Sequence, residues 1–474
     1  MKIGSRITHI ARLLNSCIRG ISANPRSGYR PGWSAALFLG VLAVHLVSAA
    51  SAGEPIRFSA EHPWLAADGE VLNPAVHRID VSKQKAGTIP DLTASDWTVA
   101  VWNFPAWNPG GKHMPELAFG KTLRLPLLYD SSDPECLHNG VYYYRLSNPD
   151  AMDWQIKWMR EAGINLVMFD WYPSESKEAF DNSPRHRSIN ASIEEGFLGK
   201  SKTGGSPVKT NRFEKKMKFL AMWTNHGHAW IPQGTMEYAC ENFLNQPNYY
   251  TLDGKPIIII HAPGILRDEH GGEGTNHEKM ENLRKWILEQ RTIAASYGHP
   301  EVIMALGAIY PQFARDFKEI GFDMCFTYLT PADEELETVT PVEFYKNGEK
   351  VADGELHEAD YETVMIPSQK KFWTAQAKVW GPRNYVPTVT MRADWRHWHP
   401  QRMLYYHGCT PDVYADTLEM AKRHVEQIGG RKFLTVGIWN EIYEDEYIEP
   451  DVKYGYEYSK RIKAAFGENS RTEK

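Results

Sequence analysis

Eight short runs of β-branched, aromatic and other apolar residues recur along the chain. They occupy residues 97–104, 164–172, 218–223, 256–263, 302–308, 323–329, 385–391 and 433–441. The runs are almost continuously apolar and do not alternate with polar residues, which is typical of parallel strands covered on both faces. The pattern therefore predicts eight buried strands.

Segments with helical periodicity lie between these runs. Residues 148–163 carry a broad apolar arc, with Pro149 near its start and Gly163 at its end, as expected for a helix. Residues 280–298 and 411–430 repeat the pattern. Eight strands alternating with helices predict an α/β protein with a single (β/α)8 TIM-type barrel and long βα loops. A doubly wound open sheet is the alternative.

The first 52 residues have the pattern of a signal peptide. Six basic and no acidic residues occur there, and an uncharged run ends in the small residues Ala50 to Ala52. We expect cleavage after Ala52, a secreted or periplasmic protein, and no stable membrane span after cleavage. An uncleaved anchor is the alternative, but the apolar run is shorter than the ~20 residues that span a membrane. Residues 53–94 then form a short N-terminal extension, and residues 95–470 the catalytic domain.

Charge and cysteine content narrow the function classes. Removal of residues 1–52 takes away six positive charges, so the net charge of −6 becomes −12 and nucleic acid is not an expected partner. Cys136, Cys240, Cys325 and Cys409 remain, and none has metal-ligand spacing. Their pairing stays open, although Cys325 lies in an apolar run and is expected to be a buried thiol.

Polar and aromatic residues collect where the predicted strands end, which is where a barrel of this type builds its site. The residues expected to bind substrate are Trp102, Asp170, Trp171, Tyr172, Asn225, His226, His261, Tyr328, Arg392, Asp394, Trp395 and Asn440. Taken singly, His261 could equally be a core residue, and Asp170 could have no role beyond an ion pair with a neighbouring Arg. As a set, we expect Trp102, Asp170, Tyr172, Asn225, His226, Tyr328 and Trp395 to line one pocket with Glu441.

Residues 436–451, VGIWNEIYEDEYIEPD, hold six carboxyl groups behind the last predicted strand. If the chain turns helically after Glu441, Glu441 and Glu444 share a face with their Cβ atoms ~5 to 6 Å apart. Two such carboxyl groups can flank a glycosidic bond, and repulsion would keep one of them protonated near neutral pH. A solvated acidic turn or a calcium site is the alternative interpretation, but the spacing matches no calcium loop. We expect Glu441 and Glu444 to be catalytic, with no metal and no cofactor.

The segment WNEIYEDEYIEPDVKYGYEYSKRI, residues 439–462, resembles the closing segment of glycoside hydrolase family 99-like barrels. That group includes family 71-like glucanases and the WbsX-like proteins of O-antigen loci. The segments WQIKWMREAGINLVMFDWY, NQPNYYTLDGKPIIIIHAPG and YVPTVTMRADW resemble other parts of the group. The likeness extends from about residue 97 to residue 468 and is most specific in the final motif.

The resemblance implies hydrolysis of an α-linked glycan with retention. In the mechanism proposed for the family, the first Glu of the motif, here Glu441, takes the proton of the sugar 2-hydroxyl, which displaces the leaving group through an epoxide-like intermediate. The second, here Glu444, protonates the leaving oxygen and later activates water. The chain departs from the usual motif at Ile442, where an aromatic residue is common, and at Asp445, where Gly is common. Substrate preference is therefore not carried over.

The sequence thus predicts an exported glycoside hydrolase acting on a mannan-like or other polysaccharide. The alternative is a barrel that binds carbohydrate without turnover or that serves in surface-polysaccharide assembly. Transfer from a nucleotide sugar has no support in the sequence, because no Gly-rich phosphate loop opens any predicted helix. The sequence names neither the sugar nor its linkage, nor internal or terminal cleavage, nor the oligomeric state.

Overall fold

The chain divides into two compact units, Met1–Ser51 and Ala52–Lys474. The computed structural model describes residues 56–59, 77–89, 95–105, 125–138, 141–173, 189–200, 213–225, 234–272, 274–307, 310–330, 338–346, 349–395 and 402–467. All of these residues belong to the second unit. The predicted signal peptide and its cleavage site lie outside them.

All eight predicted runs form strands of one parallel sheet. The strands are β3 (Thr98–Asn103), β7 (Leu166–Trp171), β8 (Lys218–Thr224), β10 (Lys255–His261), β11 (Ile303–Gly307), β12 (Met324–Phe326), β15 (Tyr385–Val386) and β18 (Phe433–Ile438). They are neighbours in chain order, and β18 pairs with β3. The sheet closes on itself where Val389 N–H donates to the Thr435 carbonyl at 2.8 Å. The predicted (β/α)8 barrel is therefore confirmed.

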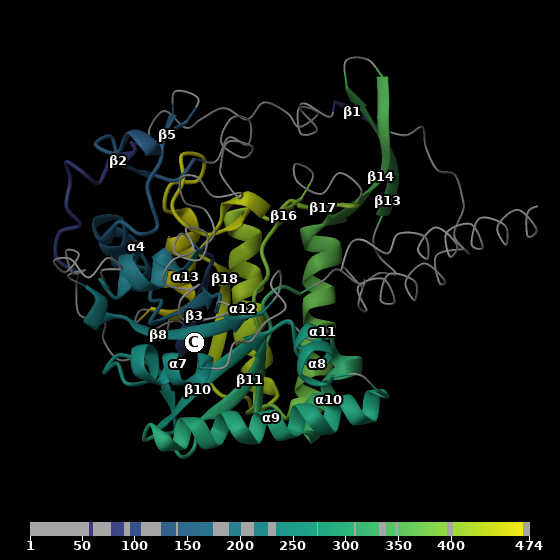
Figure 1. Cartoon of the computed structure of the whole chain (residues 1–474). Helices are drawn as coiled ribbons and strands as arrows, with labels where there is room; N and C mark the ends of the chain where they lie inside the picture. The colour runs from purple at the N-terminus through teal and green to yellow at the C-terminus, as the bar shows by residue number, and fades with distance from the viewer. Residues whose placement is uncertain are drawn as a thin grey trace, which may run out of the picture. The chain divides into compact units, whose positions relative to one another are not determined.

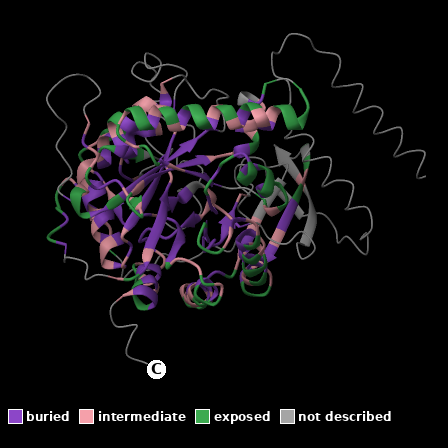
Figure 2. Cartoon of the chain, turned by 90° about the horizontal axis from the view of Figure 1, so that it is seen from below, coloured by how far each residue is buried: buried purple, intermediate pink, exposed green. Residues whose placement is uncertain are grey.

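Helices and short turns connect the strands on the outside of the barrel. They are α4 (Pro149–Glu161), η2 (Ser192–Phe197), η3 (Glu214–Lys216), α7 (Thr235–Ala239), η4 (Cys240–Leu244), α8 (Pro263–His270), α9 (Asn276–Ser296), α10 (Pro311–Glu319), η5 (Tyr361–Met365), α11 (Ile366–Trp380), α12 (Pro411–Gln427) and α13 (Glu457–Phe466). Figure 2 shows buried strands at the centre and helices with exposed outer faces around them. None of the described helices combines the length and the apolar character that a membrane span needs.

Capping residues explain where two of the three predicted helices begin and where one of them ends. The Asn148 side chain accepts a hydrogen bond from the Asp150 N–H at 2.9 Å, and Pro149 occupies the first turn of α4. Helix α12 is capped in the same way by Thr410. Gly163 follows α4 with a φ of 88°, a conformation that glycine adopts at little cost. The sequence signals therefore act locally, as expected.

Alternate residues of each barrel strand face the interior of the barrel. The Trp102 indole N–H reaches across the barrel to the Thr327 carbonyl at 3.2 Å. Met168 pairs with Trp102, and Leu220 pairs with Met168, so the three side chains share the inner face. On β7 this register also turns Asp170 inward and Trp171 outward.

The long loops after β12 and β15 fold together into a second sheet, which the sequence patterns did not predict. The hairpin β13 (Thr338–Lys346) and β14 (Glu349–Asp360) follows β12, whereas β16 (Ala393–Asp394) and β17 (Arg402–His407) follow β15. The five strands lie in the order β1-β13-β14-β17-β16, and all five are labelled in Figure 1.

Two described parts of the predicted N-terminal extension pair with later segments. Strand β1 (Ile56–Ser59) lies parallel to β13 at the edge of the second sheet. Strand β2 (Ile79–Asp80) lies parallel to β4 (Leu128–Tyr129), in the loop between β3 and α4. A two-strand pair, β5 (Leu137–His138) with β6 (Val141–Tyr142), completes that loop. The four cysteines Cys136, Cys240, Cys325 and Cys409 are free and buried, which confirms the buried thiol predicted at Cys325.

Candidate active site

The turn after β18 carries the two predicted catalytic carboxyl groups. Strand β19 (Asn440–Glu441) runs into a 3-10 turn, η6 (Ile442–Glu444), and returns as β20 (Glu446–Tyr447). Glu444 is the last residue of this turn. Glu441 immediately precedes the turn, with a φ of −76° and a ψ of 60°, so the chain does turn after Glu441, and the catalytic pairing of the two carboxyl groups stays a prediction.

Glu441 is buried among other acids at the mouth of the barrel. Its side chain is 4% exposed, and it lies opposite Glu446 in the pairing of β19 with β20. Burial raises the pKa of Glu441 well above its ordinary value, and the negative charges of Glu444, Asp170 and Glu446 raise it further. Burial likewise raises the pKa of Asp170 well above the ordinary range. Protons therefore remain on this group of acids at pH values where exposed carboxyl groups are ionised.

The Tyr328 hydroxyl bridges Glu441 and Asp170. Its oxygen lies 3.2 Å from Glu441 Oε2 and 3.3 Å from Asp170 Oδ2. A phenol has a single proton to donate, so it can satisfy only one of the two carboxyl oxygens at a time. The second contact becomes a hydrogen bond only when that carboxyl group is itself protonated. If both contacts are hydrogen bonds, Asp170, Tyr328 and Glu441 form a hydrogen-bonded chain in which at least one of the two carboxyl groups is protonated.

Glu444 lies in a different electrostatic setting. It is partly buried, and this burial raises its pKa to about 7, while a hydrogen bond from the Trp395 side chain opposes the rise. A group with this pKa exists in both protonation states near neutral pH. That behaviour is required of a residue that first donates a proton and then accepts one.

Tyr172 and His261 lie beside the same group of acids. Burial raises the pKa of Tyr172 well above its ordinary value, and the charges of Asp170, Glu441 and Glu444 add to the rise, so its hydroxyl is close to them. The Asn190 side chain holds the Tyr172 backbone through hydrogen bonds of 2.9 and 2.8 Å. The His261 ring meets the Tyr328 ring edge to face at 5.4 Å. The ends of β7, β10, β12 and β18 therefore converge on one group of side chains.

The chain matches a known protein family along most of its length. The family model described as glycosyltransferase WbsX matches residues 126–462. The chain belongs to the WbsX family. Membership confirms the resemblance inferred from the closing segment, because the WbsX match includes that segment. No curated protein sequence matches the chain.

Solved structures similar to this WbsX-family protein include several glycoside hydrolases. A glycoside hydrolase-like protein has 17% identity and a TM-score of 0.46, covering 82% of this chain and 99% of the other. The GH99 endo-α-mannosidase of Bacteroides thetaiotaomicron, in complex with BIS-TRIS-propane, has 12% identity and a TM-score of 0.46, covering 81% and 98%. The family 1 β-glucosidase of Thermotoga maritima has 12% identity and a TM-score of 0.38, covering 80% and 99%.

Several residues predicted to bind substrate support the framework of the WbsX-family barrel instead. Trp102 is fully buried beneath Tyr328, with ring centroids 5.3 Å apart. The Trp171 ring points out of the barrel and stacks on Tyr238 at 5.6 Å. The Asn440 side chain holds the Phe104 backbone through hydrogen bonds of 2.8 and 2.9 Å. The Trp102 indole N–H and the Asn440 amide are therefore bonded to the backbone.

Asn225 and Arg392 also have neighbours within the protein. With the Asn225 amide oriented to suit its surroundings, its nitrogen donates to the His261 carbonyl and its oxygen accepts from the Leu266 N–H at 3.3 Å. The buried Arg392 guanidinium binds Asp445 at 3.0 Å and donates to the Tyr458 hydroxyl and, at 3.2 Å, to the Tyr447 carbonyl. Both residues therefore shape the loops around the site.

Two further predicted residues are placed less fully. Asp394 is buried in β16, where it pairs with Tyr405 of β17. His226 lies outside the described residues. Among the described residues, those gathered around Glu441 are Asp170, Tyr172, His261, Tyr328, Glu444, Glu446 and, through Glu444, Trp395.

Two of the acids after β18 are buried in ways that the sequence did not indicate. Glu446 is fully buried, and its pKa is raised well above the ordinary value by burial and then by the Glu444 charge. Glu449 is 1% exposed and accepts hydrogen bonds of 2.9 and 2.8 Å from the Tyr144 hydroxyl. Asp445, in the same turn, forms an ion pair with Arg392. The sequence does not show which of these acids are buried, because acids and bulky residues follow one another closely in a single tight turn.

Asp445 accounts for one departure from the family motif. It has a φ of 53° and a ψ of 16°, the left-handed conformation that Gly adopts most easily and that Asp tolerates better than most residues. The backbone shape expected of the usual Gly is thus kept, and the carboxylate adds the bond to Arg392. Among the described residues, no group of His, Cys, Asp and Glu side chains is arranged to hold a metal ion.

Proposed function

We propose that the protein is an exported glycoside hydrolase that cleaves an α-linked glycan with retention, using Glu441 and Glu444. The observation that carries the proposal is the pair of carboxyl groups on one turn at the end of β18, with the pKa of Glu444 raised to about 7. Two carboxyl groups that flank a glycosidic bond are the usual machinery of glycosidases. Export rests on the predicted signal peptide alone.

In the first step, Glu441 takes the proton of the sugar 2-hydroxyl. The 2-oxygen then attacks the anomeric carbon from the face opposite the leaving group and forms an epoxide-like intermediate, which requires a sugar whose 2-oxygen is trans to the leaving group, as in an α-mannoside. As the bond from the anomeric carbon to the leaving oxygen breaks, Glu444 donates its proton to that oxygen. At the end of this step Glu441 is protonated and Glu444 is ionised.

The hydrogen-bonded chain through Tyr328 explains how a buried Glu441 can act as a base. When Asp170 holds the proton, it donates to the Tyr328 oxygen, and Tyr328 donates to an ionised Glu441. Glu441 is then a carboxylate with a raised pKa, which makes it a stronger base than an exposed carboxylate. Asp170 and Tyr328 thus position the proton before the sugar arrives.

In the second step, the ionised Glu444 takes a proton from water. The resulting hydroxide attacks the anomeric carbon and opens the three-membered ring, while Glu441 returns its proton to the 2-oxygen. Two successive inversions at the anomeric carbon leave its configuration unchanged, which is retention. Both carboxyl groups end the cycle in their starting protonation states, so the two steps balance without a cofactor or a metal.

Glycosyl transfer is the second candidate, because the matching family model is described as a glycosyltransferase. A nucleotide-sugar donor would bring a diphosphate to the site. Among the described residues, Glu441 is surrounded by carboxyl and phenol groups, and the nearby Arg392 is engaged by Asp445, Tyr447 and Tyr458. This environment favours an uncharged sugar over a phosphorylated one, and it supports hydrolysis.

The experiment is product analysis with the whole exported protein, purified after export. We expect a panel of α-mannans, α-glucans and sulfated glycans to contain at least one that is cleaved, with solvent oxygen appearing in the new reducing end. Glu441→Gln and Glu444→Gln should each lower turnover by at least about 10²-fold. Glu426→Gln, an exposed position on α12, is the matched control and should leave turnover unchanged.

Three results would count against the proposal. Sugar transfer from a nucleotide donor would favour a glycosyltransferase. Binding of a glycan without any cleavage would favour a non-catalytic barrel. Retention of more than about a tenth of wild-type turnover by either Gln variant would remove that residue from the catalytic pair.

A further inference from the structure

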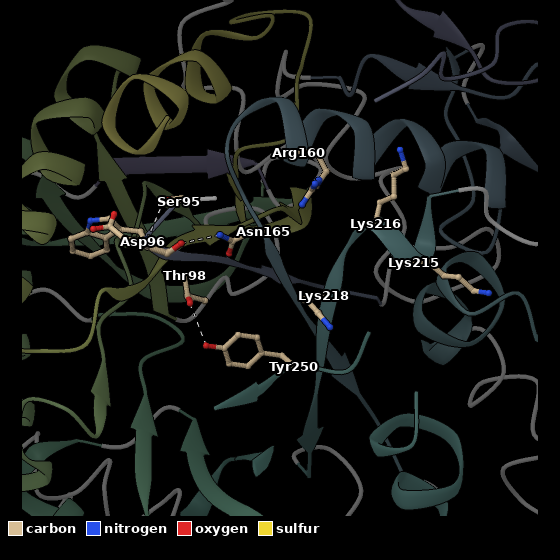
Figure 3. A pocket seen from close by; sticks show the side chains of 10 residues that line it. Ser95, Asp96, Thr98, Arg160, Asn165, Lys215, Lys216, Lys218 and Tyr250 are labelled. Atoms are coloured by element: carbon tan, nitrogen blue, oxygen red, sulfur yellow. Dashed lines mark hydrogen bonds between the residues drawn. The ribbon is translucent and has the colours of Figure 1, made fainter. Parts of the chain in front are cut away.

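A second cavity lies at the end of the barrel opposite the Glu441 turn. Its volume is about 320 Å³, and its walls include the first residues of two strands, Thr98 of β3 and Lys218 of β8. Tyr250 and Arg160 also line it, and Figure 3 shows them among the lining side chains. Parallel strands all begin at one end of a barrel and end at the other, so this cavity is remote from the acids after β18.

The walls of this cavity are basic. Arg160, Lys215, Lys216 and Lys218 line it, and Asp96 is the one acid among its lining residues. The Asp96 carboxylate forms an ion pair with Lys432. The three lysines are exposed, and Lys218 also donates to the Pro247 carbonyl at 3.2 Å. The whole chain has a net charge of −6, so a group of basic residues at one cavity is not a consequence of overall composition.

The cavity also offers neutral donors in a fixed arrangement. The Thr98 and Tyr250 hydroxyl oxygens lie 3.2 Å apart and share one hydrogen bond, which leaves the second of their two hydrogens for a ligand. Asn165 stiffens the neighbouring wall, because its side chain bonds the Val99 N–H at 3.0 Å and the Trp97 carbonyl at 2.9 Å. Figure 3 shows the two hydroxyls facing each other on one side, with Arg160 and Lys218 on others.

We propose that this cavity is a second carbohydrate site that binds a sugar bearing an oxyanion, either a sulfate ester or a carboxylate. The cations would pair with the oxyanion, and the hydroxyl pair would bond the sugar. A cavity of about 320 Å³ lies at the small end of ligand pockets, of a size for a single sugar unit. The opposite, acidic end of the barrel disfavours such a group, so an acidic glycan is held away from the catalytic carboxyl groups. Binding at the cavity is inferred from the cavity itself, whereas the separation of the glycan from the catalytic carboxyl groups rests on the proposed function.

Calorimetry with three oligosaccharides of equal length tests the proposal. The probes are sulfated dextran, polygalacturonate and neutral dextran fragments, and the protein is the full chain after export. We expect at least one acidic probe to bind at least about tenfold more tightly than the neutral probe, and more weakly at high salt. The sulfated and uronate arms distinguish the two oxyanions.

Variants separate the cavity from general attraction to a charged polymer. Lys215→Gln with Lys218→Gln should weaken binding of the acidic probe at least about tenfold. The matched control, Lys285→Gln with Lys378→Gln, removes the same charge from exposed positions on α9 and α11 and should leave affinity unchanged. Tyr250→Phe, which changes no charge, should also weaken binding because it removes a donor.

Thermal unfolding of each variant shows whether it remains folded, and a folded variant gives a decisive result. Equal losses in the Lys215/Lys218 and Lys285/Lys378 variants would overturn the proposal, because they would show only diffuse electrostatic attraction. Equal binding of neutral and acidic probes would overturn it as well. Unchanged affinity of the Tyr250→Phe variant would exclude the hydroxyl pair from the site and contradict the proposal in its stated form.

Discussion

The hydroxyl oxygen of Tyr328 lies 3.2 Å from the Oε2 atom of Glu441, which joins the end of β12 to the turn after β18. The same oxygen lies 3.3 Å from Asp170 at the end of β7. Three strands thus contribute to one proton-holding chain at the mouth of the barrel. Its consequences can be measured.

Tyr328→Phe should lower kcat/KM about 10- to 100-fold on the identified substrate. The substitution removes a hydrogen bond to an ionised group, worth about 1.5 to 3 kcal/mol, and keeps the ring that packs on Trp102. Tyr297→Phe is the control, since that hydroxyl bonds the exposed Glu241 at 3.0 Å. Unchanged kinetics in both variants would show that the Tyr328 hydroxyl has no part in turnover.

The dependence of kcat/KM on pH should follow Glu444. Because burial raises the pKa of Glu444 to about 7, the protonated form needed to donate to the leaving oxygen is lost as pH rises through about 7. We therefore expect kcat/KM to fall on the alkaline side. A substrate whose leaving group needs no proton should lose much of this alkaline decline, and an identical decline with both substrates would contradict the assignment.

Glu449 should make the protein less stable as pH rises. Its pKa is about 8 in the folded protein, raised mainly by burial, against an ordinary value of 4.5. Between these values the folded state binds more protons than the unfolded state, so the free energy of unfolding falls with increasing pH. Below about 4.5 the group is protonated in both states and contributes no penalty.

Glu449→Gln should remove that part of the pH dependence, because Gln stays neutral and can still accept from Tyr144. The measurement is urea unfolding at several pH values from acid to mildly alkaline. We expect the variant to lose less stability than wild type across this range, by on the order of a few kcal/mol. Parallel curves for the two proteins would show that Glu449 does not titrate as described. Glu426→Gln serves as the exposed control.

Arg392→Met should destabilise the turn that carries Glu444. The substitution removes the cation bound to Asp445 and the donors to Tyr447 and Tyr458, and breaking a buried pair in this way costs about 3 to 5 kcal/mol. Asp445→Gly should cost less, because Gly suits the φ of 53°. Urea unfolding of both variants and of the double variant measures their coupling.

The exposed pair of Arg431 and Asp253, at 2.7 Å, is the control for that experiment. Arg431→Met should cost less than about 1 kcal/mol, as is usual for a surface ion pair. Similar losses from Arg392→Met and Arg431→Met would contradict the role given to Arg392.

The eight strands and the main helices could be predicted from the sequence because their causes are local. Short continuous apolar runs rich in β-branched and aromatic residues are typical of covered strands, and residues such as Asn148, Pro149 and Gly163 mark helix ends through their own backbone preferences. The spacing of Glu441 and Glu444 on one short turn could also be read from the sequence, whereas their action as a catalytic pair stays a prediction.

The roles of individual rim residues required the tertiary structure. Asp170 and Trp171 are neighbours in sequence, yet one faces the acids inside the barrel and the other packs on Tyr238 outside it. A strand that is covered on both faces has no polar side, so its hydrophobic pattern does not reveal which residues point inward. The sequence therefore determined where the strands lie, whereas the register of neighbouring strands decided which side chains meet.

Local sequence patterns also could not predict the contacts between segments that are distant along the chain. Arg392 reaches Asp445, Tyr447 and Tyr458, and the second sheet joins β1 to loops that follow β12 and β15. Nothing in the composition of one segment specifies a partner so far away along the chain. The sequence by itself determined the strands of the barrel, through short-range propensity, and the position of the acids after its last strand. Only the closed barrel, which brings strand ends from the whole chain to one rim, decided which residues surround them.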